Sequence, residues 1–149
     1  MLYVGGGVAA YFLLIKPLLQ KLGIVKSKDE VEEEKKQDTS QTNYVNNASG
    51  NLTKSQSEWQ IIANTIYEDL RYSSLDDNKA DAGYQVARVQ TEKDLATLIK
   101  AFGFRQEYFF GLPAGGKKDL PAFIRSNLSK SAIDQINWNY RSKKIKFQY

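Results

Sequence analysis

A segment of fourteen residues without a charge, Leu2 to Ile15, constrains this chain more than any other feature of its sequence. At about 1.5 Å of rise per residue, a helix of that length covers about 21 Å of a hydrocarbon core about 30 Å thick. Apolar residues continue as far as Val25, and the side chains of Lys16 and Lys21 can reach back to lipid headgroups. We therefore expect residues 1–26 to form a single membrane-anchor helix, with lipid contacts from Leu2, Tyr3, Val4, Val8, Tyr11, Phe12, Leu13, Leu14 and Ile15.

Three other interpretations of this segment stay open: a buried core helix, an interfacial helix and a cleaved signal peptide. A signal peptide carries a basic region before its apolar run and small residues at its cleavage site, and neither pattern occurs here. The flanking lysines all follow the apolar run, so the positive-inside rule predicts a single-pass protein with its C-terminal part in the cytoplasm. Small residues from Gly5 to Ala10 allow close approach of a second helix, which makes a homo-oligomer one expectation.

Residues 27–52 are predicted to connect this anchor to a separate head. The stretch KDEVEEEKK, residues 28–36, contains good helix formers and little apolar surface, which favours a solvated helical extension. Residues 37–52 are rich in Gln, Asn, Ser and Thr, and they have little apolar surface with which to offset chain entropy. We expect them to form a flexible polar tether.

Residues 53–149 carry apolar side chains at helical spacing and are predicted to form a small all-α bundle of about five helices. The first helix is expected at residues 54–72, capped by Thr53, and a short second helix at 82–89. The third is expected to begin after Thr91 and to end at Gly103. A fourth should follow Asp119, a fifth should be capped by Ser129 or Ser131, and residues 143–149 should form a short extended tail.

The composition excludes several classes of chemistry. Histidine and cysteine are absent, which removes disulfides, thiol nucleophiles, the usual zinc sites and any Ser-His-Asp relay. No spacing pairs an acid with a base, so no catalytic residue and no cofactor are assigned and a non-enzymatic protein is expected.

Two segments show partial likeness to ligand-binding loops. The acids Asp76, Asp77 and Asp81 lack the alternation and the distal glutamate of a calcium-binding loop. They are interpreted as helix-capping or solvated acids, no metal is assigned, and calcium binding stays open. The segment GLPAGGKKD, residues 111–119, lacks the spacing of a nucleotide-binding loop and is interpreted as a linker between helices.

Positive charge gathers near the C-terminus. From residue 117 to residue 149 there are eight lysines and arginines against two aspartates. The stretch Arg141, Lys143, Lys144 and Lys146 alternates with apolar residues and is predicted to bind an anionic partner, either anionic lipid or nucleic acid. A solvated basic face without a partner is the alternative.

The segments IIANTIYEDL (61–70), TEKDLATLIKAFGFR (91–105) and LPAFIRSNLSKSAIDQINWNYRSKKIKF (120–147) together resemble a single copy of an annexin-like helical module. The resemblance covers about 95 of the 149 residues. Such modules occur in membrane or virion proteins of phages that infect Bacteroidetes and in related bacterial proteins. Calcium binding is not carried over, because SSLDDNKAD (73–81) does not match the calcium loop of annexins.

The anchor and the resemblance predict a non-enzymatic, membrane-anchored structural or interaction protein. The resemblance implies a minor virion protein of a lipid-containing bacteriophage, placed in the virion membrane and linking it to the capsid or a vertex. The expected partners are the lipid bilayer and either a capsid protein or another membrane protein. The alternative function is a membrane-attached module that binds nucleic acid or anionic lipid through its basic C-terminal segment; nucleic acid is the less favoured partner.

Overall fold

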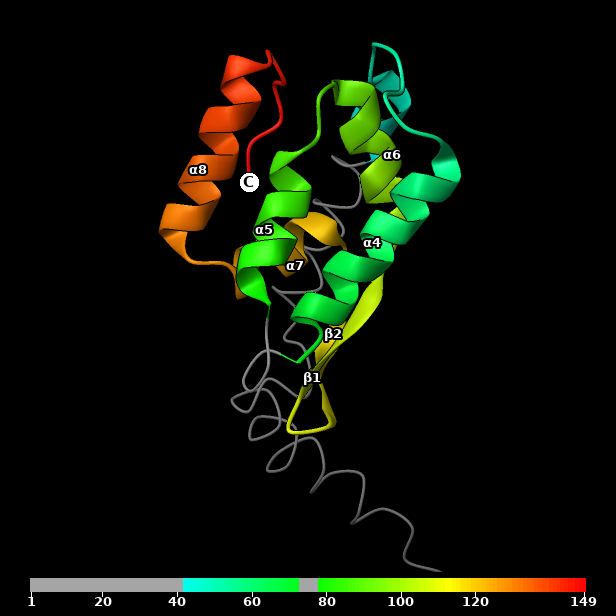
Figure 1. The fold of residues 1–149 in the computed structure, drawn as a ribbon. Coiled ribbons are helices and arrows are strands. Elements are labelled where there is room, and N and C mark those ends of the chain that lie inside the picture. The colour runs from blue at the N-terminus through cyan, green and yellow to red at the C-terminus, as the bar shows by residue number, and fades with distance from the viewer. Residues whose placement is uncertain (1–41, 73–77) are drawn as a thin grey trace, which may run out of the picture.

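A computed structural model describes residues 42–72 and 78–149 of this chain (Figure 1). The predicted anchor segment, residues 2–15, and the loop acids Asp76 and Asp77 lie outside the described residues. Among the helices within the described ranges, none combines the length and the apolar character needed to cross a membrane.

After a short helical segment at residues 42–47, the described chain consists of five helices and one antiparallel hairpin. In chain order they are α4 (Gln56–Leu70), α5 (Lys79–Ala87), α6 (Glu92–Phe102), β1 (Arg105–Phe109), β2 (Leu112–Lys118), α7 (Leu120–Asn127) and α8 (Lys130–Ser142). Each helix begins after a residue whose side chain accepts a hydrogen bond from a backbone N–H of the first turn: Ser55, Asn78, Thr91, Asp119 and Ser129. The five predicted helices are present, but α4 is capped by Ser55 with Glu58, not by Thr53.

The prediction of an all-α fold is wrong, because residues 105–118 form a two-stranded antiparallel sheet. The expected linker at residues 111–119 is largely strand β2. Neither strand contains a valine, isoleucine or threonine, and β2 reads LPAGGKK, so only Tyr108 and Phe109 of β1 belong to the residue types that favour strands. The hairpin is held by contacts to the helices around it, which a local pattern does not reveal.

The core lies between the helices. The buried face of α4 consists of Trp59, Ala63, Ile66 and Leu70, and α4 packs against both α5 and α6. The α6 face adds Leu95, Leu98, Ile99 and Phe102, and α7 adds Leu120, Phe123 and Ile124. Helix α8 covers α5 and closes the core with Ile136 and Tyr140 (Figure 1).

Part of the predicted tether belongs to the head. Residues 42–47 are helical, and Tyr44 and Val45 pack against the core. The backbone N–H and the hydroxyl of Thr53 donate to the buried carboxylate of Asp94, at 2.8 and 2.7 Å. The hydroxyl of Thr91 also donates to the carbonyl of Asn51 at 2.9 Å. Residues 42–53 of the predicted linker region therefore contact the head in this structure.

The C-terminal tail packs against the helices. Ile145 is buried, and the side chain of Asn137 both donates to and accepts from the backbone of Tyr149. Burial raises the pKa of the Tyr149 phenol above its usual value. The aromatic residues of the tail therefore complete the core.

Candidate functional site

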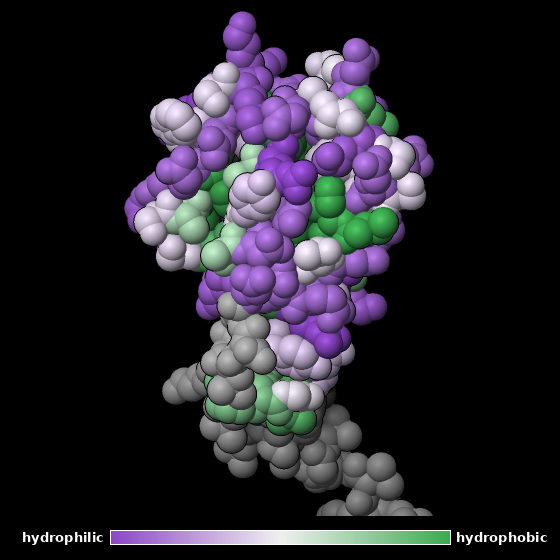
Figure 2. All heavy atoms as spheres, viewed as in Figure 1, coloured by the Kyte–Doolittle hydropathy of each residue, from purple (hydrophilic) through white to green (hydrophobic). Residues whose placement is uncertain are grey.

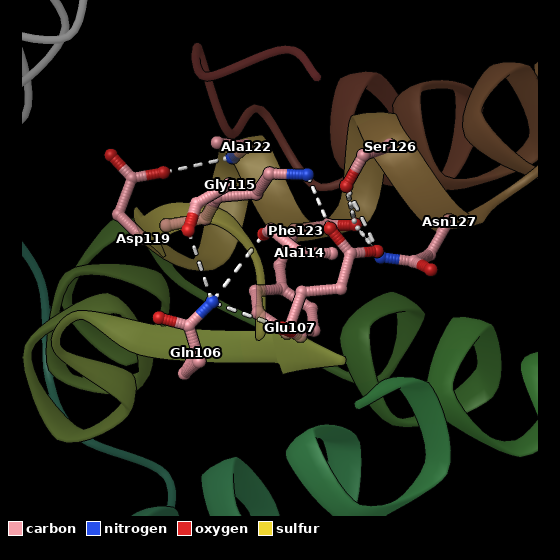
Figure 3. A network of polar contacts seen from close by, with 10 residues as sticks. Gln106, Glu107, Ala114, Gly115, Asp119, Ala122, Phe123, Ser126 and Asn127 are labelled. Carbon is pink, nitrogen blue, oxygen red and sulfur yellow. Dashed lines mark hydrogen bonds and ion pairs between the residues drawn. The ribbon is translucent and has the colours of Figure 1, made fainter. Parts of the chain in front are cut away.

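The base of the hairpin is fixed by a network of polar contacts (Figure 3). The side-chain amide of Gln106 donates to the carbonyl oxygens of Glu107, Ala114 and Gly115, at 3.0, 3.4 and 3.3 Å. These bonds bridge the two strands. They lie beside a shift in the strand register, a β-bulge or similar irregularity, between Arg105 and Glu107. A single glutamine side chain thus bonds backbone carbonyls on both strands of the hairpin.

Two further contacts fix the base of the hairpin, one between its two strands and one at the start of α7. The carboxylate of Glu107 is 5% exposed and forms an ion pair with Lys118 on the opposite strand. Directly after β2, the carboxylate of Asp119 accepts a hydrogen bond from the backbone N–H of Ala122 at 2.8 Å and caps α7 (Figure 3). The strand therefore runs into the helix without a free linker.

Helices α4 and α6 hold β1 from the other side. The Tyr67 hydroxyl donates to the carbonyl of Gln106 at 2.9 Å, and the Tyr108 N–H donates to the carbonyl of Arg71 at 2.8 Å. The guanidinium of Arg105 donates to the carbonyl of Phe102 at 2.8 Å and to the side chain of Asn64 at 2.7 Å. Burial lowers the pKa of this arginine. The base of the hairpin is thus a rigid part of the head.

The apex of the hairpin, residues Phe109 to Leu112, projects beyond this base (Figure 1). Phe109, Phe110 and Leu112 are 50%, 66% and 70% exposed. Figure 2 shows apolar surface at this lower end of the view, under a head whose visible face is largely hydrophilic. Three large apolar side chains in four residues form an exposed patch of the kind that marks an interaction site.

The backbone of the apex is strained. Phe109 pairs with Leu112, so Phe110 and Gly111 form a two-residue turn, and their φ angles are 49° and 78°. Two positive φ angles are those of a type I′ turn, for which Asn-Gly is the favoured sequence. A bulky residue such as phenylalanine costs about 1–2 kcal/mol in this left-handed conformation. Within the described part of the chain, no core packing offsets that cost, because Phe110 is exposed and its ring contacts that of Phe109, 4.5 Å away between centroids.

Aromatic and cationic groups surround the hairpin behind its apex. Tyr72 pairs with Tyr108 as an isolated bridge, with ring centroids 5.9 Å apart, and it is partly exposed. The Arg71 guanidinium lies over the Tyr72 ring, 4.6 Å from its centroid, and pairs with Glu68 at 2.9 Å. Amphipathic tyrosines and an arginine thus lie between the apolar apex and the body of the head.

The predicted anionic-partner residues lie at the opposite end of the head, where α8 ends (Figure 1). Lys143 is engaged inside the protein: its ammonium donates to the carbonyls of Ala87 and Val89, both at 2.8 Å. Burial lowers its pKa, and its role is to satisfy the carbonyls at the end of α5. The side chains of the other three are exposed, and these residues are Arg141, Lys144 and Lys146.

Lys144 also has a left-handed backbone, with φ of 59°. It follows the last turn of α8, and the next N–H, from Ile145, donates back to the carbonyl of Tyr140 at 2.9 Å. This arrangement is a Schellman motif, in which glycine is the usual residue at the left-handed position. A lysine there is held in an exposed position by the helix end.

Of the three loop acids named in the sequence, Asp81 lies in the described part of the chain, in the first turn of α5. Asp81 lies close enough to Asp69 for its charge to act there, and burial first, then that charge, raise the pKa of Asp69 to about 6. Within residues 42–72 and 78–149, no group of three or more acidic side chains is placed to hold a metal ion. An open hollow between α4 and α6 is lined by polar side chains that include Gln60, Lys93 and Lys100.

Sequence reasoning therefore located the basic end and missed the hairpin apex. The available signal was FFGL, in which a glycine follows two phenylalanines and no charged residue occurs from residue 108 to residue 116. That run was interpreted as loop because it lacks the alternation of a half-buried strand.

Comparisons of the chain with protein families, with curated proteins and with solved structures find no match, so its resemblance to the annexin-like module stays a prediction.

Proposed function

We propose that this chain is a non-enzymatic interaction protein that works at a membrane. One end of its head contacts the bilayer, and the opposite end of the head binds a partner. The observation that carries the proposal is the separation of two surfaces on one rigid head. The exposed apolar residues of the hairpin apex lie at one end, and the exposed cations Arg141, Lys144 and Lys146 lie at the other (Figure 1).

The order of these surfaces suits a linking role. An apolar end is stabilised by contact with a bilayer or a protein, whereas an exposed basic end favours an anionic surface. A head that carries both at opposite ends contacts two partners at once. The uncharged segment from Leu2 to Ile15 supports a bilayer as one of them. Placement in a phage particle rests on the resemblance alone and stays a prediction.

The alternative function, binding of nucleic acid through the basic segment, is less favoured by the geometry. Lys143 is bonded to backbone carbonyls of α5 and its neighbour Val89, and the Arg141 guanidinium donates to the side chain of Gln148 at 3.0 Å. Of the predicted set, Lys143 is thus engaged inside the protein, and the three exposed cations that remain provide few phosphate contacts. Binding of a short DNA duplex should accordingly be weak and should fall steeply between about 0.05 and 0.2 M salt.

The test of the proposed function is flotation of the full chain with phosphatidylcholine vesicles, followed by extraction in 1 M salt and in alkaline carbonate. We expect the protein to stay with the vesicles in both treatments, because apolar contacts are not screened by salt. Protein that remains at the bottom of the gradient, or that leaves in carbonate, overturns the proposal.

A further inference from the structure

We propose that the apex of the β1–β2 hairpin, with Phe109, Phe110 and Leu112, enters the boundary between lipid headgroups and acyl chains. This inference deepens the proposed function and rests on it, because it names the part of the head that touches the bilayer. Its occupant is lipid, which is favoured over a protein by the charge distribution, the shape, the neighbouring side chains and the backbone strain of the apex.

The charge distribution of the hairpin permits insertion. Residues 108–116 contain no charged side chain, and the charges of the hairpin lie at its base. There the buried carboxylate of Glu107 is neutralised by its ion pair with Lys118. Insertion of the apex therefore requires no charge to leave water, which is the main cost of placing protein in a bilayer.

The shape of the apex suits a fluid surface. A β-carbon added at Gly111 would meet no atom of the described residues within 4 Å, so this side of the turn is open with respect to the rest of the head. A convex apolar projection is enclosed readily by lipid chains, whereas a protein partner must supply a matching apolar cavity. The hollow between α4 and α6 is lined mainly by polar side chains, among them Gln60, Lys93 and Lys100, beside Val45 and Leu52, so a second copy of this head offers there only a partly apolar site for phenyl rings.

The groups behind the apex match the headgroup layer. Tyr72 and Tyr108 lie against each other, and the guanidinium of Arg71 lies over the Tyr72 ring. Tyrosine is enriched where a protein crosses from lipid to water, because its ring is apolar and its hydroxyl is polar. Arg71 is paired with Glu68 at 2.9 Å, which places a charged but mutually neutralised pair at the depth of the headgroups. The order from apex to base is thus apolar, then amphipathic, then polar.

The strain at Phe110 indicates that its side chain serves a contact outside the head. The type I′ turn would be stabilised by asparagine, yet the chain holds an exposed phenylalanine there in a left-handed conformation. Strain that the surrounding fold does not explain is a marker of function. A lipid contact explains why a large apolar residue occupies the most projecting position.

The experiment places a fluorescent reporter at the apex of the full chain. The chain has two tryptophans: Trp59 is buried, and Trp138 on α8 is 59% exposed. The variant Leu112→Trp with Trp138→Phe reports on the apex, and the unmodified chain, with its exposed Trp138, reports on α8. Both are reconstituted with phosphatidylcholine vesicles whose acyl chains carry bromine, which quenches tryptophan emission on contact.

The expected result is strong quenching of the apex reporter and little quenching of the unmodified chain. Adding Phe110→Asn to the apex reporter should reduce that quenching at least twofold, while the melting temperature stays the same or rises. That combination separates a lipid contact from a structural role, because the asparagine suits the turn and does not unfold it.

The outcomes against the inference are distinct from failure of the proposed function. If the protein floats with the vesicles but the apex reporter is not quenched, the inference is wrong and the proposed function stands. If the protein does not float, both fail. If the emission of the apex reporter shifts to the blue with protein concentration in detergent, without lipid quenching, the apex faces a second copy and the lipid proposal is overturned.

Discussion

At each end of the head, one residue with an exposed side chain has a strained, left-handed backbone, and the two ends differ in the cause of that strain. Phe110 at the hairpin apex and Lys144 after α8 are non-glycine residues with positive φ angles, 49° and 59°. At Lys144 the fold imposes the conformation, because the chain must turn for the next residue, Ile145, to become buried. The phenylalanine at the apex serves no such packing.

That difference shows which kind of strain is informative. A left-handed residue at a helix end is held by the turn itself, so the identity of its side chain says little about function. At the apex, the same turn would form more readily with Asn-Gly. The choice of phenylalanine there has to be explained by something outside the head. The predictions below test this comparison in order of decreasing effect.

The largest effect is expected from a phenylalanine that the core does use. Phe123 is fully buried and lies in edge contact with Phe102 and Tyr67, with ring centroids 5.3 and 5.9 Å apart. Phe123→Ala should lower the free energy of unfolding by about 3–5 kcal/mol, because it leaves a cavity. Urea unfolding, followed by tryptophan emission, measures this change, because Trp59 is buried and leaves the core on unfolding whereas Trp138 is already exposed. Phe110→Ala is the matched control and should change stability by less than about 0.5 kcal/mol; a loss comparable to that of Phe123→Ala would show that the apex is structural.

The next effect is expected at the base of the hairpin. Lys118→Met removes the partner of the buried Glu107 carboxylate and should cost about 3 kcal/mol of stability, since an unpaired charge then remains buried. The double variant Glu107→Gln with Lys118→Met should recover part of the loss. The same urea unfolding tests both variants. Equal stability of the wild type and Lys118→Met would mean that the pair does not fix the hairpin.

The sequence predicted the helical part of the head better than the hairpin, for a physical reason. Helices α6 and α7 carry local signals: a capping side chain at Thr91 or Asp119 and an apolar stripe with a period of 3.6 residues. The hairpin depends on bonds between residues far apart in the chain, such as that from the Tyr67 hydroxyl to the carbonyl of Gln106. Such bonds produce no periodic pattern of apolar residues in the sequence of either partner, so they cannot be recognised from the sequence.

The same distinction explains the candidate site. Charge is visible in composition, so the basic end was predicted, although the internal role of Lys143 depends on the end of α5, more than fifty residues earlier. Exposure of an apolar residue is not visible in composition, because phenylalanine is expected to be buried. Phe110 and Phe123 differ only in where the fold places them.

A smaller effect, which depends on pH, is expected between the two ends, where α4 meets α5. Burial, followed by the charge of Asp81, raises the pKa of Asp69 to about 6. The folded chain therefore holds this proton more tightly than the unfolded chain, so the contribution of Asp69 to stability falls as pH rises from about 4 to 6. Asp69→Asn should raise stability by about 1 kcal/mol at pH 7, with allowance for solvent screening, and leave it unchanged at pH 4. Melting curves at the two pH values measure this, with the exposed Asp134→Asn as control; an equal gain at both values would contradict the assigned cause.

The smallest effect is expected from Lys144→Gly at the end of α8. Glycine adopts a positive φ without a steric penalty, so the variant should gain about 0.5–1 kcal/mol, measured as a rise in melting temperature. Lys144→Ala is the matched control: it removes the same charge but keeps a β-carbon in the left-handed conformation, and it should gain nothing. If both variants are stabilised alike, the gain comes from removing positive charge near other cations and not from the backbone. In that case the backbone at Lys144 would carry little strain, and of the two ends only the hairpin apex would have a strained backbone.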